Sequence, residues 1–413
     1  MTSLEQLREH KARSVAAGPA LWSAGVERRA HWLASALAEL SPNGALFAAA
    51  LAPVARSAGL SEAMVRWALE STLAPYSAEA LLAWERAIPL PSPRAVRARP
   101  GALCVAVLAG NVFTAAIRAV VLPLLLGMPV LAKCAAQDGA FVEWLARALT
   151  RADPELAAAF GYVTFSSEDQ TLARALFDGA DTVVAYGSDS TLRAIRAELR
   201  GDVDFIGHGH GLGAAFIDRG ALQDQASAAR AAEALALDVA AYDQRGCMSP
   251  LLAWVTTGQP VGPEAFARQL FEALGALARE LPRGPLPLDV AGAQLAFRGV
   301  AALRGTLLEG DGFAVAYEGD GPLRVSPGYR NLLLLDLPNA EALPQRLAPL
   351  SVHLRCLGLA GVRDVGRLLA ALPARAAPRV CTVGRMQQPP LTALHDGLSA
   401  WEGLVRYTDS ELA

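Results

Sequence analysis

The fold is decided in residues 102–134, which read ALCVAVLAGNVFTAAIRAVVLPLLLGMPVLAKC. This segment opens with a short apolar run at Ala102–Leu108, continues through an apolar stretch of helical length at Thr114–Leu126, and closes on a second apolar run at Val130–Lys133. A strand, a helix and a second strand in this order form a parallel βαβ unit, because the crossover helix returns the chain to the same sheet. The segment therefore predicts an α/β fold built on a parallel sheet.

The same alternation continues after residue 134. We expect further strands at Gly161–Phe165, Thr182–Tyr186 and Ala214–Ile217, the last of which closes the sheet. Helices are expected between them at Gly139–Thr150, Asp169–Phe177 and Thr191–Leu199. Such a series is typical of a dinucleotide-binding domain, but no GxGxxG motif follows the first strand. Any cofactor must therefore be held by a variant of the Rossmann contact.

The regions on either side complete the predicted domain organisation. Residues 1–98 have helical periodicity, as in Ala30–Leu40 and Glu62–Leu73, and the Pro- and Arg-rich segment Pro89–Pro100 separates them from a dinucleotide-binding domain at 99–218. A second α/β domain is expected at 219–378, followed by a C-terminal segment at 379–413. Its expected helices and strands are Asp224–Ala241, Leu251–Val255, Pro263–Glu280, Leu332–Leu335 and Leu354–Ala360.

The composition narrows the class of protein. The chain is 53% hydrophobic and 19% charged, which favours an ordered globular protein. Its formal net charge is −3 with scattered Lys and Arg residues, so a nucleic-acid partner is not expected. The N-terminus lacks the apolar run of a signal peptide, and Val120–Ala132 falls short of the ~20 apolar residues of a transmembrane helix. We expect a cytoplasmic protein.

Cys247 is the candidate nucleophile. The five cysteines are odd in number and show no CxxC spacing, and four lie in apolar sequence that is typical of core residues. Cys247 instead lies in AAYDQRGCMSP, residues 240–250, between a predicted helix and a predicted strand. A cysteine there can present its sulfur in a cleft, where catalysis would require a stabilised thiolate. An ordinary loop cysteine is the other interpretation.

Residues Gly110 and Asn111 follow the first strand directly, in LAGNVF at 108–113. Ligands of open α/β sheets bind beyond the carboxyl ends of the strands, so Gly110 is a candidate cofactor contact. The amide of Asn111 could stabilise an oxyanion, or it could cap the following helix, which Asn does well.

Three more residues lie at strand ends on the same sheet edge. Lys133 ends the second strand, and Gly187 and Ser188 follow the strand at 182–186. A lysine there can reach a cofactor ribose or phosphate, and a Gly-Ser turn that opens a helix can bind a pyrophosphate with its N–H groups. Strand-end Lys and Ser residues also serve as common caps.

A glycine-rich stretch with two histidines, FIGHGHGLGAAF, occupies residues 205–216. If the backbone is extended, His208 and His210 lie on the same side of the strand. Two histidines without a third ligand in the sequence nearby do not indicate a metal site, so we expect none. Proton transfer is the favoured role, because histidine titrates near neutral pH.

These pieces occur in the order of the aldehyde dehydrogenase superfamily: strand-end Asn, Lys, Gly-Ser, a glycine-rich strand, then Cys. Three runs resemble more closely the acyl-CoA reductase family of bacterial bioluminescence, its fatty acid reductase component. They are FIGHGHG (205–211), YDQRGCMSP (242–250) and RVCTVGRMQQPPLTALHDG (379–397). The resemblance spans roughly residues 100 to 400.

The resemblance implies a variant Rossmann domain and an α/β catalytic domain with the active site in the cleft between them. It further implies that Cys247 accepts the acyl group, that Asn111 stabilises the oxyanion, and that Lys133 and Ser188 contact NADPH or NADH. The superfamily dimerises through a C-terminal arm, so a homo-oligomer is expected. The corresponding segment here, Arg379–Ala413, is short, and its role stays open.

Two family motifs differ in this sequence. Where hydrolytic aldehyde dehydrogenases have a glutamate in ELGGK, this chain reads HGHGL, so His208 falls near the glutamate and Leu212 near the lysine. The EIFGP motif, whose glutamate binds the nicotinamide ribose, has only VSPGYR (325–330) as its nearest counterpart. The missing glutamate is the base that activates water, so its absence should protect an acyl-cysteine from hydrolysis.

The sequence thus predicts an acyl-CoA reductase that forms an acyl-cysteine and reduces it to an aldehyde. Its substrate would be an acyl-CoA or an acyl-carrier thioester, with an acyl-transferring protein as a possible partner. An aldehyde dehydrogenase that acts oxidatively and a non-reducing acyl-carrying subunit are the alternatives.

Overall fold

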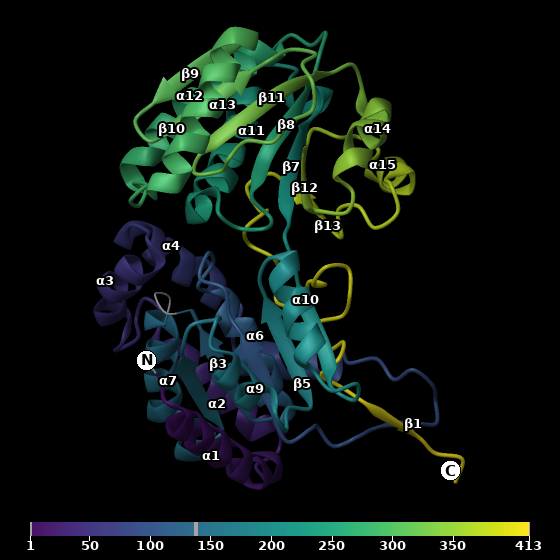
Figure 1. Cartoon of the computed structure of the whole chain (residues 1–413). Helices are drawn as coiled ribbons and strands as arrows, with labels where there is room; N and C mark the ends of the chain where they lie inside the picture. The colour runs from purple at the N-terminus through teal and green to yellow at the C-terminus, as the bar shows by residue number, and fades with distance from the viewer. Residues whose placement is uncertain (1, 136–138, 413) are drawn as a thin grey trace.

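The computed structural model describes residues 2–135 and 139–412, which form two lobes around separate sheets (Figure 1). The lower lobe in Figure 1 contains a parallel five-stranded sheet in the order β4-β3-β2-β5-β6. Its strands are β2 (Cys104–Val107), β3 (Val130–Cys134), β4 (Phe160–Thr164), β5 (Thr182–Tyr186) and β6 (Asp204–His208). After β2, the chain adds β3 and β4 on one side of this strand, and it later adds β5 and β6 on the other side. The carboxyl ends of β2 and β5 therefore flank a topological switch point.

Helices cover both faces of this sheet. The N-terminal helices pack with α6 and α7 on one face, whereas α9, α10 and the start of α1 pack on the other. The first group comprises α1 (Leu4–Ser23), α2 (Val26–Glu39), α3 (Phe47–Ala58), α4 (Glu62–Leu73) and α5 (Ala78–Arg86). The others are α6 (Ala115–Leu126), α7 (Ala140–Ala152), α8 (Pro154–Ala158), α9 (Gln170–Phe177) and α10 (Asp189–Glu198).

The upper lobe contains a seven-stranded sheet in the order β13-β12-β7-β8-β11-β10-β9. Only β9 runs antiparallel to its neighbour. The strands are β7 (Leu212–Ile217), β8 (Pro250–Thr256), β9 (Thr306–Gly310), β10 (Phe313–Tyr317), β11 (Asn331–Leu337), β12 (Leu354–Ala360) and β13 (Arg379–Thr382). Alternate residues of these strands face the two sides of the sheet, and each side has its own apolar core.

Helices α11 (Gln225–Ala240) and α12 (Pro263–Glu280) cover one side of the upper sheet. Helices α13 (Leu288–Arg304), α14 (Leu343–Leu347) and α15 (Val365–Ala371) cover the other. Single 3-10 turns lie at η1 (Arg219–Ala221), η2 (Ala241–Gln244), η3 (Ala340–Ala342) and η4 (Ala348–Leu350). The predicted alternation of strands and helices is thus confirmed in both lobes.

One strand prediction is wrong. We expected the strand at Ala214–Ile217 to close the first sheet, but β7 pairs with β8 and β12 in the upper sheet. The first sheet is closed instead by β6, which pairs with β5. Strands β6 and β7 are both short and lie on either side of Gly209–Gly211. Local periodicity therefore does not indicate which strand belongs to which sheet. The chain crosses between the lobes at residues 209–211.

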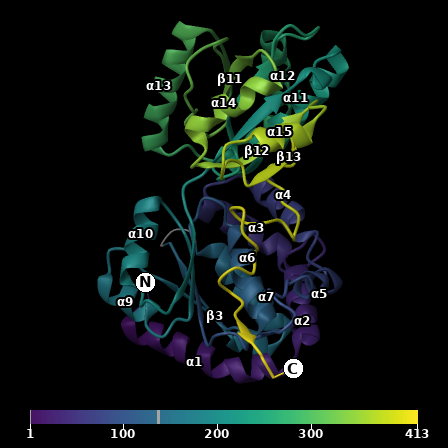
Figure 2. The same ribbon diagram turned by 90° about the vertical axis from the view of Figure 1, so that its right-hand side faces the viewer.

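The C-terminal segment returns from the upper lobe to the lower lobe. Figure 2 shows it in yellow, running down from β13 across the lower lobe. It ends in β14 (Tyr407–Asp409), which forms an antiparallel pair with β1 (Ala95–Arg97). On the way, the carbonyl of Gly403 accepts a hydrogen bond from the Thr182 hydroxyl at 3.2 Å, and Trp401 packs against Trp84. In the part of the chain that the structure describes, no helix has the length and apolar character needed to cross a membrane.

Candidate active site

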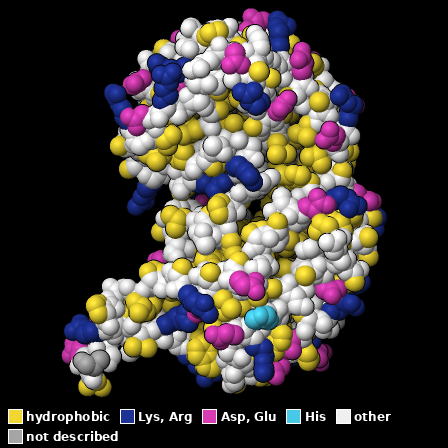
Figure 3. Space-filling view, turned by 180° about the vertical axis from the view of Figure 1, so that it is seen from behind, with side chains coloured by type: hydrophobic (Ala, Val, Ile, Leu, Met, Phe, Trp, Pro, Cys, Tyr) yellow, Lys and Arg dark blue, Asp and Glu magenta, His cyan; other side chains and the backbone are white. Residues whose placement is uncertain are grey.

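A pocket of about 570 Å³ lies between the lobes, lined by residues from both sheets and from the C-terminal segment. Figure 3 shows the waist between the lobes from behind, bordered by hydrophobic and by Lys or Arg side chains. The sequence-predicted residues that line it are Asn111, Gly187, Ser188, His208, His210 and Cys247. The structure therefore brings together side chains from the ends of three strands and the cysteine loop.

The loop that carries Cys247 has an unusual backbone. Between α11 and β8, Tyr242, Asp243 and Gln244 have φ values of 51°, 52° and 59°, all in the left-handed region. Three consecutive non-glycine residues in this region are strained, and such strain persists only where the surroundings impose it. The loop therefore requires specific partners for these side chains.

Each of the three side chains has such partners. The hydroxyl of Tyr242 hydrogen-bonds those of Thr114 at 2.8 Å and Thr72 at 3.3 Å. The amide of Gln244 donates to two backbone carbonyls, at 2.6 and 2.8 Å. Asp243 accepts two hydrogen bonds on one carboxylate oxygen from Arg330, at 2.9 and 2.7 Å. These contacts fix the direction in which the chain presents Cys247.

Through Arg330, residues 325–330, the nearest counterpart of the EIFGP motif, contact the loop that carries Cys247. Arg330 is 1% exposed and is committed to Asp243 and to the Leu281 carbonyl, at 2.7 Å. Tyr329 and Arg330 also have left-handed φ values of 52° and 65°. Neither residue is among those that line the pocket. In this structure the segment supports the cysteine loop from behind.

The thiol of Cys247 opens toward the pocket, where the side chain is exposed. Protein atoms enclose it on the other sides, and this burial together with the charge of Asp396 raises its pKa, while Arg355 lowers it. The thiol is therefore neutral at neutral pH and needs a base to become a nucleophile. Gly211 leaves room beside it, since a Cβ there would lie 3.1 Å from Cys247 Cβ and 2.3 Å from Arg355 Cγ.

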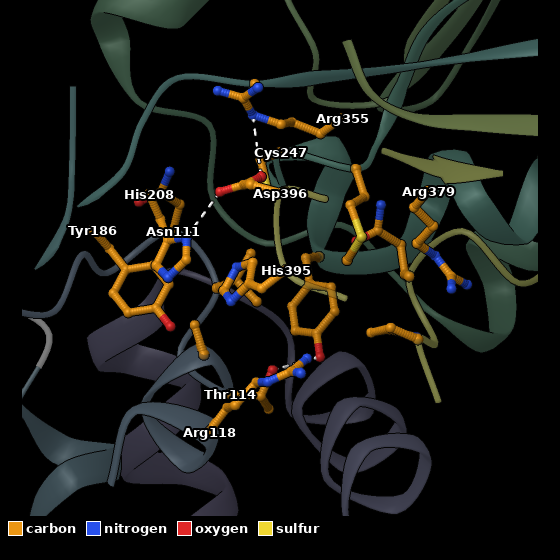
Figure 4. Close-up of a pocket in the computed structure, with 18 of the residues that line it drawn as sticks. Asn111, Thr114, Arg118, Tyr186, His208, Cys247, Arg355, Arg379, His395 and Asp396 are labelled. Atoms are coloured by element: carbon orange, nitrogen blue, oxygen red, sulfur yellow. Dashed lines mark hydrogen bonds and ion pairs between the residues drawn. The ribbon is translucent and has the colours of Figure 1, made fainter. Parts of the chain in front are cut away.

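A histidine and an aspartate form the base beside it. His208, at the end of β6, bonds through Nδ1 to an oxygen of Asp396 at 2.8 Å, and Arg355 Nε lies 3.3 Å from the other oxygen (Figure 4). Burial opposes the charge on Asp396, but the bond from His208 and the neighbouring positive charges lower its pKa overall. Because a carboxylate only accepts, Nδ1 of His208 carries a proton and Nε2 is the basic atom.

His395 stacks on His208, with ring centroids 3.5 Å apart and planes at 10°. Burial and the nearby His208 lower the pKa of His395 to about 3, so its ring is neutral. Neither His395 nor Asp396 was assigned a role from the sequence, although both lie in the run 379–397. The only signal was the HDG triplet itself, because nothing local indicates that it meets a strand end 188 residues earlier.

His208 has two neighbours that could act as metal ligands and that the sequence did not indicate, whereas His210 is not one of them. His208, His395 and Asp396 each offer a ligand atom, and these atoms lie within 4.8 Å of one another. Both Asp396 oxygens are engaged, however, one by His208 and the other by Arg355, and the His208 and His395 rings are stacked face to face. The arrangement suits proton transfer better than metal coordination.

Asn111 lines the same pocket and is exposed. Helix α6 begins at Ala115 with Thr114 in the N-cap position and has no side-chain capping bond, so Asn111 does not cap it. Its amide makes no hydrogen bond with any described residue. The amide is therefore free to donate to a ligand.

His210 lies beyond the end of β6 and has different neighbours from His208. Its ring packs edge-on against His353, with centroids 5.6 Å apart, and its backbone N–H donates to Asp189 at 3.1 Å. Strand β6 ends at His208, so His210 lies outside it, although both histidines line the pocket. His208 is consequently the better placed of the two for proton transfer with Asp396.

The candidate cofactor residues divide into two groups. Gly187 and Ser188 line the pocket, and the Ser188 hydroxyl caps α10 by accepting from Thr191 N at 3.2 Å. Lys133 and Gly110 are not among the residues that line it. The Lys133 ammonium lies over the Phe165 ring, 5.4 Å from its centroid, and burial lowers its pKa.

Comparison with known proteins places this architecture. The structure is similar to a putative aldehyde dehydrogenase from Burkholderia cenocepacia (TM-score 0.77, 17% identity, 98% of this chain and 91% of that one). It is also similar to a NAD-dependent benzaldehyde dehydrogenase from Corynebacterium glutamicum (TM-score 0.75, 15% identity, 99% and 90%). At such low identity the structural similarity shows a shared fold alone, and the predicted fold class is confirmed.

A variant of proline utilization A from Bradyrhizobium japonicum is similar as well (TM-score 0.74, 16% identity). The match covers 98% of this chain, which spans less than half, 45%, of that protein. No curated protein sequence matches this chain. A model of the family described as acyl-CoA reductase (LuxC) matches residues 59–407, and the chain therefore belongs to this family of enzymes.

Proposed function

We propose that this enzyme reduces an acyl thioester to an aldehyde through an acyl group on Cys247, with NADPH or NADH as the reductant. One observation carries the proposal. Cys247, the unpaired amide of Asn111 and the His208–Asp396 pair line a single pocket between the two lobes. These groups supply a nucleophile, an oxyanion donor and a base.

Acylation begins with the neutral thiol of Cys247. His208 Nε2 takes the thiol proton, and the carboxylate of Asp396 stabilises the imidazolium that forms. The thiolate attacks the thioester carbonyl, and the amide of Asn111 and the Cys247 backbone N–H donate to the developing oxyanion. Collapse breaks the bond to the carrier sulfur, which leaves as a thiol with the proton from His208.

The residues at the switch point fit a nicotinamide cofactor. Gly187 and Ser188 follow β5 at the N-terminus of α10, where backbone N–H groups and the helix dipole favour a phosphate. A Cβ at Gly187 would lie 3.2 Å from Thr191, so a side chain there would crowd this turn. We propose that Gly187 and Ser188 hold the pyrophosphate and that Gly110 and Lys133 make further contacts.

The reduced cofactor, when bound, supplies the hydride that converts the acyl-cysteine into a thiohemiacetal. Expulsion of the Cys247 thiolate from the alkoxide of that thiohemiacetal forms the aldehyde. His208 is neutral after its proton has left with the carrier thiol, so it takes up a proton from solvent and can pass this proton to the sulfur. Competing hydrolysis needs a base for water. Asp396 is a poor base because His208 and Arg355 bind both of its oxygens and its pKa is low. The resemblance places His208 where hydrolytic aldehyde dehydrogenases have a glutamate, and we propose that Nε2 of His208 exchanges its proton with sulfur instead of activating water.

We further propose acyl-CoA or an acyl-carrier thioester as the acyl donor. We also propose a division of labour in which residues 99–218 bind the cofactor, except for β7, which belongs to the upper sheet, and residues 219–378 carry the nucleophile, with 1–98 packed on the former. The family description supports acyl-CoA as the first substrate to test.

The test follows cofactor oxidation and aldehyde formation with NADPH or NADH and a series of acyl-CoAs. Wild type should consume cofactor with at least one of them, and Cys247→Ala should not. Cys381→Ala, which removes a partly buried cysteine, is the matched control and should retain turnover. Without cofactor, intact-mass analysis should find one acyl group on wild type and none on Cys247→Ala.

Two results would contradict the proposal in different ways. Acid formed from aldehyde and NAD, without reduction of any thioester, would indicate an oxidative aldehyde dehydrogenase. Acylation of Cys247 with no consumption of either cofactor would indicate an acyl-carrying subunit.

A further inference from the structure

Arg118 occupies the pocket without a counter-charge. It lies on α6 and lines the same pocket as Cys247 (Figure 4). Its Nη2 donates to the Ala393 carbonyl at 2.6 Å, and its guanidinium lies 5.1 Å from the centroid of the Trp84 ring. Its buried Nε has no hydrogen-bond partner in the described structure, and its Nη1 bonds to no described residue.

No described carboxylate forms an ion pair with Arg118, in contrast to Arg355 in the same pocket, which pairs with Asp396. Burial lowers the pKa of Arg118, whereas the nearby phenols of Tyr76 and Tyr186 raise it. An arginine remains charged in proteins even so. A half-buried, uncompensated guanidinium is costly unless a ligand supplies the missing negative charge.

The same two phenols offer further donors. Tyr76 and Tyr186 both line the pocket, and within the described residues neither hydroxyl makes a hydrogen bond. Burial raises the pKa of each, that of Tyr76 to about 12, so both stay protonated and can donate. Arg118, Tyr76 and Tyr186 therefore form a group of free donors, which we name the donor cluster.

The donor cluster and the thiol belong to one continuous space. All three residues of the cluster line the pocket that contains Cys247. The ring centroid of Tyr186 lies 6.0 Å from that of His395, which stacks on His208. Figure 4 shows His395 between Asp396 and Arg118. An acyl chain attached to Cys247 that extends past His395 would reach the donor cluster with its far end.

We propose that the acyl group of the natural substrate carries a carboxylate at its far end, and that Arg118 binds this carboxylate together with Tyr76 and Tyr186. The proposal rests on the acyl-cysteine chemistry proposed above and names its substrate class: the thioester of a dicarboxylic acid. A plain hydrocarbon chain would leave the guanidinium and both phenols without partners, whereas a carboxylate has acceptor sites for all three.

The first experiment compares matched pairs of acyl-CoAs of equal chain length, one ending in a carboxylate and one in a methyl group, from four to ten carbons. Wild type should prefer the carboxylate at one or two lengths by more than tenfold in kcat/KM, as expected for a charge-assisted contact. In Arg118→Met this ratio should fall below about two, and Arg118→Lys should retain part of it.

The methyl-ended substrates report on the structural role of Arg118, which also holds Ala393 near His395 and Asp396. If Arg118→Met lowers both members of each pair equally, the residue only positions this segment, and the proposal is overturned. A wild-type preference for the methyl-ended chains at every length would overturn it as well.

A second measurement does not depend on turnover. Isothermal titration with the free acids, adipate against hexanoate and the longer pairs, should detect the dicarboxylate binding more tightly to Cys247→Ala than the monocarboxylate does. The difference should vanish when Arg118→Met is added. Loss of all reductase activity with this binding difference intact would refute the proposed function alone; equal binding of both acids at every length would refute the donor cluster as a carboxylate site.

Discussion

Removal of Arg330 should destabilise the loop that presents Cys247, although Arg330 lies outside the pocket. Both members of the Arg330–Asp243 pair have side chains only 2% exposed. In Arg330→Met, Asp243 would keep a single hydrogen bond, from Gly284 N at 2.9 Å, while its charge stays buried. Breaking a buried pair by removing one partner costs about 3–5 kcal/mol. Some of this cost should appear locally, because the pair holds three left-handed residues before Cys247.

Two assays separate the global effect from the local one. Thermal unfolding should give a clearly lower Tm for Arg330→Met, and alkylation of Cys247 well below that Tm should be slower, because the sulfur no longer points reliably into the pocket. Arg330→Lys keeps the charge but loses the bidentate contact with Asp243. Its Tm and its alkylation rate should therefore lie between those of wild type and Arg330→Met. The matched control is Arg147→Met, which breaks an exposed pair with Glu143 and should cost less than about 1 kcal/mol.

The reasoning would be refuted if Arg330→Met were as stable as Arg147→Met and its Cys247 reacted at the wild-type rate. A lower Tm with an unchanged alkylation rate would mean that the Arg330–Asp243 pair stabilises the fold in general but does not orient Cys247.

Two other predictions concern the site and its support. Asn111→Ala should lower the rate of Cys247 acylation by about 10²–10³, as loss of an oxyanion donor does, and a near wild-type rate in rapid-quench measurements would remove Asn111 from that role. Burial raises the pKa of Asp238 to about 7, so the folded state binds its proton more tightly than the unfolded state, and its contribution to stability should fall as the pH rises from about 4 to 7. Asp238→Asn should abolish this part of the pH dependence of Tm; parallel wild-type and variant curves would contradict the assignment.

The local pattern of the sequence predicted most individual elements, because apolar runs and helical spacing are properties of a few neighbouring residues. The strand at Thr182–Tyr186 and the helices at Glu62–Leu73 and Pro263–Glu280 have the predicted bounds. Sheet membership was harder. Whether β6 or β7 closed the first sheet depends on pairing with β12, well over a hundred residues later, and no local signal carries that information.

The site residues divide in the same way, into those with a local sequence signal and those that depend on long-range contacts. Cys247, Asn111 and His208 were predicted from the ends of strands and from the resemblance, and the structure gathers them around one pocket. Asp396, His395 and Arg118 were not predicted as site residues. Their roles arise from contacts across the fold, such as the 2.8 Å bond between His208 and Asp396, and not from any motif around them.

The course of the C-terminal segment has a mechanical consequence. It is fixed to the upper lobe by β13 and to the lower lobe by Trp401, Gly403 and β14, with His395 and Asp396 between these attachments. A strap fastened at both ends cannot keep its course when its anchors move. If the distance between the two lobes changes, the segment between β13 and Trp401 must therefore shift as well. This shift would move His395 and Asp396, which contact the ring of His208 next to the Cys247 thiol.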